Sequence, residues 1–286
     1  IRGGGRQSIG CIAVVRGGRH QADHPGMKVT VVNLAVDVTL PTPDAVLDAY
    51  HSLTGWCDAL VTAGLSVSVV QAFREPAQRS RSGVDYRFCR SSASRLALGA
   101  EVLDAVLTAQ ADIVHVNGLD APLQIWWLRR SLPGVTALVV QDHASVPSRS
   151  LSIKAPIRRR AMAAADAFLF TAGTQAKPWL DAGFITEPER VHEVLEASTG
   201  LARVSRPEAS AATGMEGAPS VLWVGRLTPN KDPLTVLAGF ELAAADLPGA
   251  MLTMIFSDGT LLREVRTRVA AAGLAGRVRL VGAVPH

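Results

Sequence analysis

Short apolar runs and helical patterns alternate along most of the chain. From Lys28 onward, candidate strands cover residues 28–34, 65–71, 112–117, 135–141, 166–171 and 190–195. Helical patterns lie between them, near residues 44–63, 95–110, 120–131, 154–165 and 174–182. Strands that alternate with helices predict a parallel sheet with helices on both faces and right-handed crossovers. Residues 27–199 are therefore predicted to form one Rossmann-like α/β domain.

The pattern changes after residue 199. Residues 200–219 are rich in Ser, Ala, Gly and Pro and show no periodicity, which predicts a linker. A second alternation follows, with strands at 220–225, 250–256 and 277–282 and helices near 232–245 and 259–272. Three strands are half of a doubly wound sheet. We therefore expect residues 220–286 to be part of a second Rossmann-like domain that is incomplete.

Length and composition agree with two domains, because 286 residues with 48% hydrophobic content can supply two cores. The longest apolar runs have strand length, so no membrane span is expected. The formal charge is +4, and residues 1–26 hold four arginines and one aspartate, so the remaining chain carries only +1. No basic stripe is interleaved with aromatic residues. This distribution argues against a nucleic-acid partner.

The first 26 residues are rich in Gly and Arg and lack the apolar segment of a signal peptide. We expect them to be a non-native or disordered tail, with Met27 as the candidate start. Cys11, Cys57 and Cys89 show neither metal-ligand spacing nor an obvious pairing, which suits a reducing cytoplasm. The run 158–160 is three arginines, interpreted as a solvated helix face. The alternative is contact with anionic lipid, as in a peripheral membrane protein, or with an acceptor phosphate.

The most informative motif lies at residues 221–233, where an apolar strand runs into a glycine and then into basic residues before a helix. Gly225 allows a tight turn and a close ligand approach. Arg226 and Lys231 could bind charged oxygens, and a helix start favours an anion. The motif therefore predicts a polyphosphate site, with an ordinary turn bearing solvated charges as the alternative.

This segment resembles the G-R-L-x-x-x-K signature that opens the donor-binding domain of family 4 retaining glycosyltransferases with the GT-B fold. Residues 112–118, DIVHVNG, resemble the family's D-V-V-H type strand, and residues 139–143, VVQDH, resemble the next strand, which ends in the active-site histidine. Residues 191–199 stand where relatives carry the segment that crosses between domains. The resemblance extends over residues 28–286.

The resemblance implies two Rossmann-like domains and the transfer of a hexose from a nucleoside-diphosphate sugar to an unidentified acceptor. Arg226 and Lys231 would bind the donor diphosphate. His143 would lie near the transferred sugar and the acceptor hydroxyl. Neither a metal nor a cofactor is implied, because the two cations would neutralise the phosphates.

Other candidate cleft residues follow from position, since ligands of open parallel sheets bind beyond the carboxyl ends of the strands. These candidates are His115, Asn117, Gly118, Gln141, Asp142, Asp258 and Gly259. Three alternatives stay open. His143 could merely bond its loop, His115 could point into the sheet packing, and Asp142 could form a turn.

The chain departs from the family pattern in three places. Residues 37–43 contain no glycine where relatives carry a Gly-Gly loop, and Ser257-Asp258-Gly259 replaces Gly-x-Gly. The paired glutamates that grip the donor are expected beyond His286, so we expect this chain by itself to be inactive. Two other functions remain open: a non-catalytic GT-B-like binding protein, or another GT-B enzyme such as a sugar-nucleotide epimerase or a phosphorylase.

Overall fold

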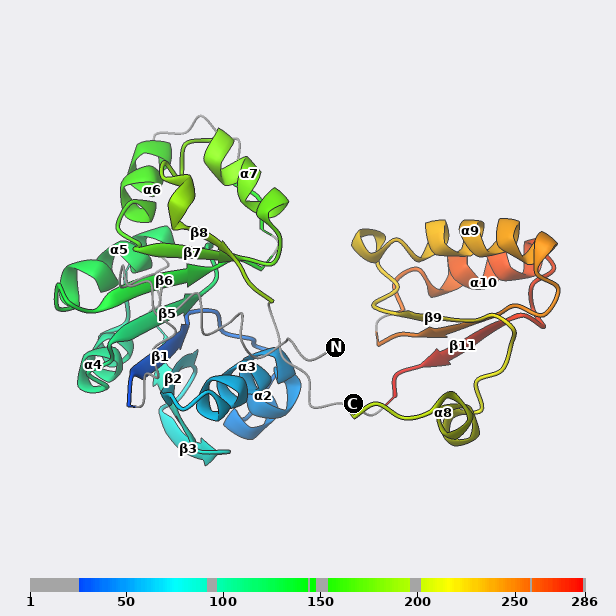
Figure 1. The fold of residues 1–286 in the computed structure, drawn as a ribbon, viewed down its shortest axis with the longest axis horizontal. Coiled ribbons are helices and arrows are strands. Elements are labelled where there is room, and N and C mark those ends of the chain that lie inside the picture. The colour runs from blue at the N-terminus through cyan, green and yellow to red at the C-terminus, as the bar shows by residue number, and fades with distance from the viewer. Residues whose placement is uncertain are drawn as a thin grey trace. The chain divides into compact units, whose positions relative to one another are not determined.

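The computed structural model describes residues 26–91, 97–143, 145–147, 154–195, 202–257 and 259–284. The chain divides into two compact units, the first ending at Gly200 and the second beginning at Leu201 (Figure 1). The predicted N-terminal tail lies outside the described residues except for Gly26.

The N-terminal unit is built on an eight-stranded sheet with the order β3-β4-β2-β1-β5-β6-β7-β8. Its strands are β1 (Lys28–Asn33), β2 (Ser66–Phe73), β3 (Ala77–Arg81), β4 (Val84–Arg90), β5 (Ile113–Asn117), β6 (Ala137–Gln141), β7 (Ala167–Phe170) and β8 (Val191–Glu193). Only β3 runs antiparallel to its neighbour. The predicted parallel α/β domain is therefore observed, with an added antiparallel edge.

Helices cover both faces of this sheet (Figure 1). They are α2 (Pro43–Ala49), α3 (His51–Thr62), α4 (Ala100–Thr108), α5 (Pro122–Ser131), α6 (Lys154–Met162), α7 (Gly173–Asp181) and the 3-10 helix η1 (Pro188–Arg190). Neighbouring residues of one strand enter different cores: Val31 packs with α2 and α3, whereas Val32 packs with α4 and α5. A strand buried on both faces reads as a continuous apolar run, which explains the sequence pattern.

Two elements differ from the sequence expectation in this unit. The single helix expected over 44–63 is two helices, because Tyr50 leaves helical geometry at φ −95° and ψ 66° and donates a hydrogen bond to Asp37. The β3–β4 hairpin was not predicted. Its turn residues Ser82 and Gly83 have φ of 53° and 78°, as a two-residue hairpin turn requires.

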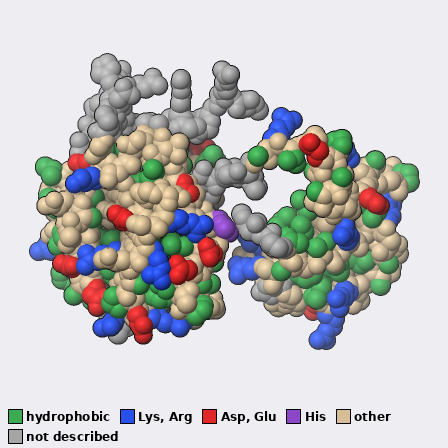
Figure 2. Space-filling view, turned by 90° about the horizontal axis from the view of Figure 1, so that it is seen from below, with side chains coloured by type: hydrophobic (Ala, Val, Ile, Leu, Met, Phe, Trp, Pro, Cys, Tyr) green, Lys and Arg blue, Asp and Glu red, His purple; other side chains and the backbone are tan. Residues whose placement is uncertain are grey.

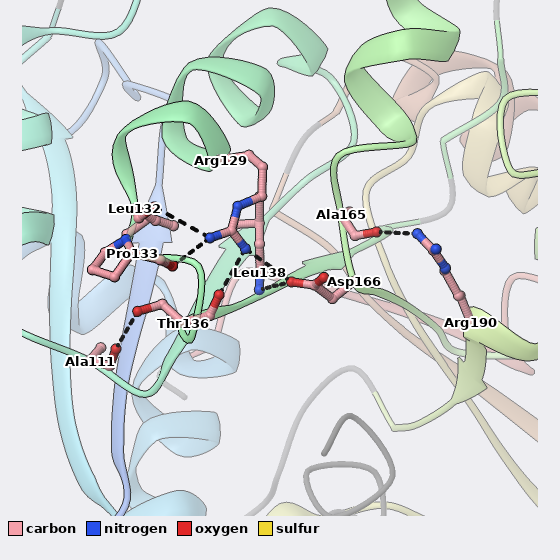
Figure 3. Close-up of polar contacts among 9 residues, drawn as sticks. All are labelled: Ala111, Arg129, Leu132, Pro133, Thr136, Leu138, Ala165, Asp166 and Arg190. Atoms are coloured by element: carbon pink, nitrogen blue, oxygen red, sulfur yellow. Dashed lines mark hydrogen bonds and ion pairs between the residues drawn. The ribbon is translucent and has the colours of Figure 1, made fainter. Parts of the chain in front are cut away.

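One arginine joins the elements that lead into β6 and β7 (Figure 3). Arg129, near the end of α5, donates to the carbonyl oxygens of Thr136 at 2.8 Å and Pro133 at 2.7 Å, and lies 3.2 Å from a carboxylate oxygen of Asp166. Asp166 in turn accepts a bond of 2.7 Å from the backbone of Leu138. This network ties the C-terminus of α5 to the starts of both strands.

Acidic and basic side chains are interspersed on the face of this unit seen in Figure 2. Ion pairs link the β3–β4 hairpin to neighbouring helices, namely Arg79–Asp44, Arg81–Asp48 and Arg87–Asp104. All six side chains are at least 40% exposed, so each pair contributes only about 0–1 kcal/mol.

The C-terminal unit contains a three-stranded parallel sheet with the order β11-β10-β9. Its elements are α8 (Arg206–Thr213), β9 (Ser220–Val224), the 3-10 helix η2 (Pro229–Lys231), α9 (Pro233–Asp246), β10 (Met251–Ile255), α10 (Leu262–Ala271) and β11 (Val278–Gly282). Leu237 and Phe240 of α9 and Val265 of α10 pack with Leu252 and Met254 of β10 in one core. This unit is also Rossmann-like, as predicted.

Helix α8 lies within residues 200–219, where a linker without structure was expected. A capping box starts it: the backbone of Glu208 donates to Ser205 Oγ, and the Glu208 carboxylate accepts from the backbone of Ser205. None of its residues is buried, so hydrophobic periodicity could not reveal it. None of the helices in the described ranges is long and apolar enough to cross a membrane.

Candidate functional site

The first group of candidate residues lies at the carboxyl ends of β5 and β6. These strands are parallel neighbours, with Asn117 opposite Gln141. The backbone of Gly118 continues the pairing through a 2.9 Å bond to the carbonyl of Gln141. Gly118 has φ of +115°, which side-chain-bearing residues rarely adopt, so glycine is needed for this turn. The sequence placed these residues at one sheet edge, and the structure brings them together there.

His143 lies just beyond β6 with an exposed side chain. Its Nε2 atom hydrogen-bonds Oδ1 of Asn117 on the neighbouring strand. Because a carbonyl oxygen can only accept, Nε2 is the nitrogen that carries the hydrogen. The Asn117 side chain therefore orients the His143 ring across the two strand ends.

His115 lies beneath this pair, on the face of the sheet that α3 covers. Its side chain is 4% exposed, and its ring meets that of Trp56 edge to face at a centroid distance of 5.6 Å. Burial, with a smaller effect from the charge of His143, lowers the pKa of His115 to about 4, against a hydrogen bond with Gln141 that raises it. The ring is therefore neutral at pH 7. His115 therefore points into the packing of the sheet, which was the alternative to a position in the cleft.

Asp142 shapes the turn after β6. It is fully buried, and its carboxylate accepts hydrogen bonds from the backbone and the hydroxyl of Ser145. Its own backbone donates to the carbonyl of Leu169 at 2.8 Å, which joins the turn to β7. These bonds give Asp142 the turn-forming role that was the alternative to a cleft role.

A cavity of about 430 Å³ opens beside Asn117 and Gly118. Residues 34–36 after β1, Ala72 of β2, and the starts of α4 and α5 at Gly99 and Ala121 also line it. Its volume is in the range of small-molecule sites. Residues 34–36, Gly99 and Gln124 were not among the predicted site residues, since they form no recognisable chemical motif. Their positions after β1 and at helix starts were the available signal.

The glycine-free loop at residues 37–43 is held by hydrogen bonds to Asp37 from within the loop and from Tyr50. Asp37 accepts bonds from the backbone and hydroxyl of Thr39 and from the hydroxyl of Tyr50. The side-chain bond of Thr39, followed by the other two bonds, lowers the pKa of Asp37. The loop thus keeps a defined shape through side-chain bonds rather than glycine flexibility.

The three arginines at residues 158–160 of α6 differ in their surroundings, so they do not form a uniformly solvated face. Arg159 donates to the carbonyl of Ala182 at 2.9 Å and lies over the Phe184 ring, so it ties α6 to the end of α7. Arg160 is exposed, and Arg158 lines a cavity of about 230 Å³ with Trp179.

The second group of candidates follows β9 in the C-terminal unit. The backbone of Gly225 donates to the carbonyl of Ile255, so the loop leaves the sheet beside the end of β10. A Cβ atom at Gly225 would lie 3.0 Å from the Trp223 ring. A larger residue here would force the Trp223 ring to shift by a few tenths of an ångström, and no left-handed turn is involved. Leu227, the residue after Arg226, is fully buried and anchors this loop to the core of the unit.

Arg226 and Lys231 are both exposed, and neither side chain has a hydrogen-bond or ion-pair partner among the described residues. Lys231 ends η2, which leads directly into α9. The expectation that the start of α9 is open to an anion is wrong in one respect. Asp232 is its N-cap, and the Asp232 carboxylate accepts a bond of 3.3 Å from the backbone of Thr235. A side-chain anion already occupies part of the helix start.

The loop after β10 lies against the loop after β9, because the backbone of Leu261 donates to the carbonyl of Leu227 at 2.8 Å. Gly259 is exposed in this second loop, and Asp258 lies outside the described residues. The carboxyl ends of β9 and β10 thus present Gly225, Arg226 and Gly259 on neighbouring loops. Across the described ranges, no cluster of three or more His, Cys, Asp or Glu side chains could hold a metal ion.

No protein-family model matches the chain, and no curated protein matches it in sequence. Solved structures do match. Sucrose-phosphate synthase from Thermosynechococcus elongatus aligns with a TM-score of 0.60 and 15% identity, over 91% of this chain and 71% of the synthase. HepE from Anabaena in complex with UDP-glucose aligns with a TM-score of 0.52 and 15% identity, over 90% of this chain and 69% of HepE. The chain has a GT-B fold.

A third neighbour with this fold is UDP-GlcNAc 2-epimerase from Methanocaldococcus jannaschii, with a TM-score of 0.50 and 11% identity over 91% of this chain and 74% of the epimerase. The GT-B fold thus supports both a synthase and an epimerase among the neighbours. The choice of reaction for this chain depends on its own site residues.

Proposed function

We propose that this GT-B protein is a retaining glycosyltransferase of the family 4 type, which moves a hexose from a nucleoside-diphosphate sugar to an acceptor hydroxyl. The observation that carries the proposal is the pair Arg226 and Lys231. Both cations are exposed, both lack partners among the described residues, and both follow a parallel strand of the C-terminal unit. Similar folds include a synthase and a protein in complex with UDP-glucose.

In the proposed reaction, the bond between the anomeric carbon and the diphosphate oxygen breaks, and its electron pair stays on the diphosphate. Arg226 and Lys231 stabilise that growing negative charge. The acceptor hydroxyl attacks from the same face and gives its proton to the departing diphosphate, so the anomeric configuration is retained. The acceptor is proposed to bind in the N-terminal unit, at the cavity beside Asn117, with His143 close to the reacting groups.

Donor binding tests the proposal directly. Calorimetry with UDP-, GDP- and ADP-glucose should identify a donor, and Arg226→Met or Lys231→Met should each weaken its binding. Losing one charge-assisted hydrogen bond costs about 1.5–3 kcal/mol, which is roughly a ten- to hundredfold rise in Kd. Arg266→Met is the matched control, because Arg266 is exposed on α10 without a partner in the described part of the chain.

Product analysis then separates the reaction classes. Where a donor is consumed, transfer gives a new glycoside with the donor's anomeric configuration, whereas an epimerase changes the sugar. If the folded protein binds none of the nucleotide sugars, or if Arg226→Met and Arg266→Met behave alike, the proposal is refuted.

A further inference from the structure

A small cavity of about 10 Å³ lies beside His143. Trp56 of α3, His115 of β5, and Asn117, Gln141 and His143 at the strand ends contribute to its lining. A cavity of this size holds about one water molecule, and a buried water needs two to four polar partners.

Two buried nitrogen atoms in this lining have no hydrogen-bond partner in the protein: Nε2 of His115 and Nε1 of Trp56. An unpaired buried polar atom costs about 1–3 kcal/mol, and such atoms are rare in folded proteins. Both side chains line the same cavity, which favours a polar site over a packing defect.

The two nitrogen atoms are complementary. The bond between His115 and Gln141 raises the pKa of the ring, so the ring donates and Gln141 accepts. Because Nε2 is the unpaired nitrogen, the donor is Nδ1, and a neutral ring then offers Nε2 as an acceptor. The indole Nε1 of Trp56 can only donate. A water between them would accept from Trp56 and donate to His115.

We propose that one structural water bridges Trp56 Nε1 and His115 Nε2, and that this buried cluster makes His115 a positioning residue for His143. His115 holds Gln141, Gln141 lies opposite Asn117 across the strand pair, and Asn117 bonds Nε2 of His143. The cluster thereby fixes the ends of β5 and β6 beneath the exposed ring. The catalytic importance of this positioning rests on the proposed glycosyl transfer. The existence of the buried cluster does not depend on that proposal.

Nuclear magnetic resonance on the whole chain with ¹⁵N- and ¹³C-labelled histidine and tryptophan tests the water bridge without any donor. His115 should be the Nδ1–H tautomer and only about a tenth protonated at pH 5, given a pKa of about 4. The Trp56 indole proton should show a cross-relaxation peak to a long-lived water. An Nε2–H tautomer, or a Trp56 indole without a water contact, would overturn the bridge.

Two variants test the positioning role. His115→Leu keeps roughly the side-chain volume and removes both nitrogen atoms, so the sharp single set of His143 ring signals should broaden or split. His115→Gln offers a donor and an acceptor again and should restore the single set. The His192 signals, from edge strand β8, serve as the internal control.

If His143 signals stay unchanged in folded His115→Leu, the positioning role is wrong. Should that variant fail to fold, Trp56→Phe is the second variant, because it removes the indole N–H donor to the water together with part of the ring. It should move the His115 Nε2 resonance, while Trp127→Phe on the exposed side of α5 should not. Equal effects of the two tryptophan variants would also refute the proposal. Failed donor binding would refute the transferase and leave all these readouts intact.

Discussion

Replacing Arg129 with methionine should loosen the strands that carry the N-terminal candidate site. The Arg129 side chain is only 20% exposed, and its guanidinium joins α5 to the starts of β6 and β7 (Figure 3). Methionine keeps most of the apolar stem but removes every donor. We therefore expect the loss to concern the carbonyl oxygens of Thr136 and Pro133 and the carboxylate of Asp166.

The magnitude follows from the surroundings of each partner. Thr136 is buried, so its carbonyl loses a partner that water replaces poorly, at about 1–3 kcal/mol. Pro133 is exposed and its carbonyl can bind water, so this bond contributes about 0.5–1.5 kcal/mol. The pair with Asp166, whose side chain is 45% exposed, contributes about 0.2–1 kcal/mol. A total loss of about 2–5 kcal/mol is expected.

Hydrogen exchange followed by mass spectrometry is the suitable assay, because a chain of two compact units need not unfold in one step. Arg129→Met should speed exchange of β6 and β7 peptides and leave β9 and β10 peptides unchanged. Arg130→Met is the control. Arg130 is exposed and lies over the Trp126 ring at 5.1 Å, a contact worth about 0.5–1 kcal/mol. Equal protection losses in the two variants would refute the role assigned to Arg129.

Two further changes have defined expected outcomes. The pKa of His115 is about 4 in the folded protein and about 6.5 when exposed, so the unfolded state binds one more proton between these pH values. Stability should therefore fall by about 3 kcal/mol from pH 6.5 to pH 4, and His115→Gln should reduce that slope in urea titrations at pH 4.5 and 7; an unchanged slope contradicts the buried neutral ring. Asp232 caps α9 at φ 44°, so Asp232→Ala should destabilise the C-terminal unit by about 1 kcal/mol or more, and Asp232→Gly by less. Thermal unfolding measures both, and equal losses would show that the left-handed backbone at Asp232 carries no cost.

The sequence revealed the elements whose side chains are buried in a regular pattern. Strands β1, β5 and β6 are apolar runs because both faces of the sheet are covered, and their ends placed Asn117 and His143 together. The β3–β4 hairpin and α8 were missed because β3 and α8 bury no side chains. Their signals were local instead: a Ser-Gly turn at residues 82–83 and a capping box at Ser205.

The residues of the two candidate sites were predicted less completely than the fold. Arg226 and Lys231 could be placed after a strand from the sequence, but the Asp232 cap depends on a left-handed backbone that no periodicity shows. The cavity beside Asn117 is lined by residues of several separate segments, which form no sequence motif. The partners of His115 come from α3 and β6, so only the folded chain brings them together.

The packing of Trp223 against Gly225 has a practical consequence. Trp223 is the sole indole of the C-terminal unit, and it touches the residue from which the basic loop departs. In a chain whose other four tryptophans were replaced by phenylalanine, the fluorescence of Trp223 would report on the loop that carries Arg226 and Lys231. Titrating such a protein with nucleotides would reveal occupancy from fluorescence alone, without an attached dye.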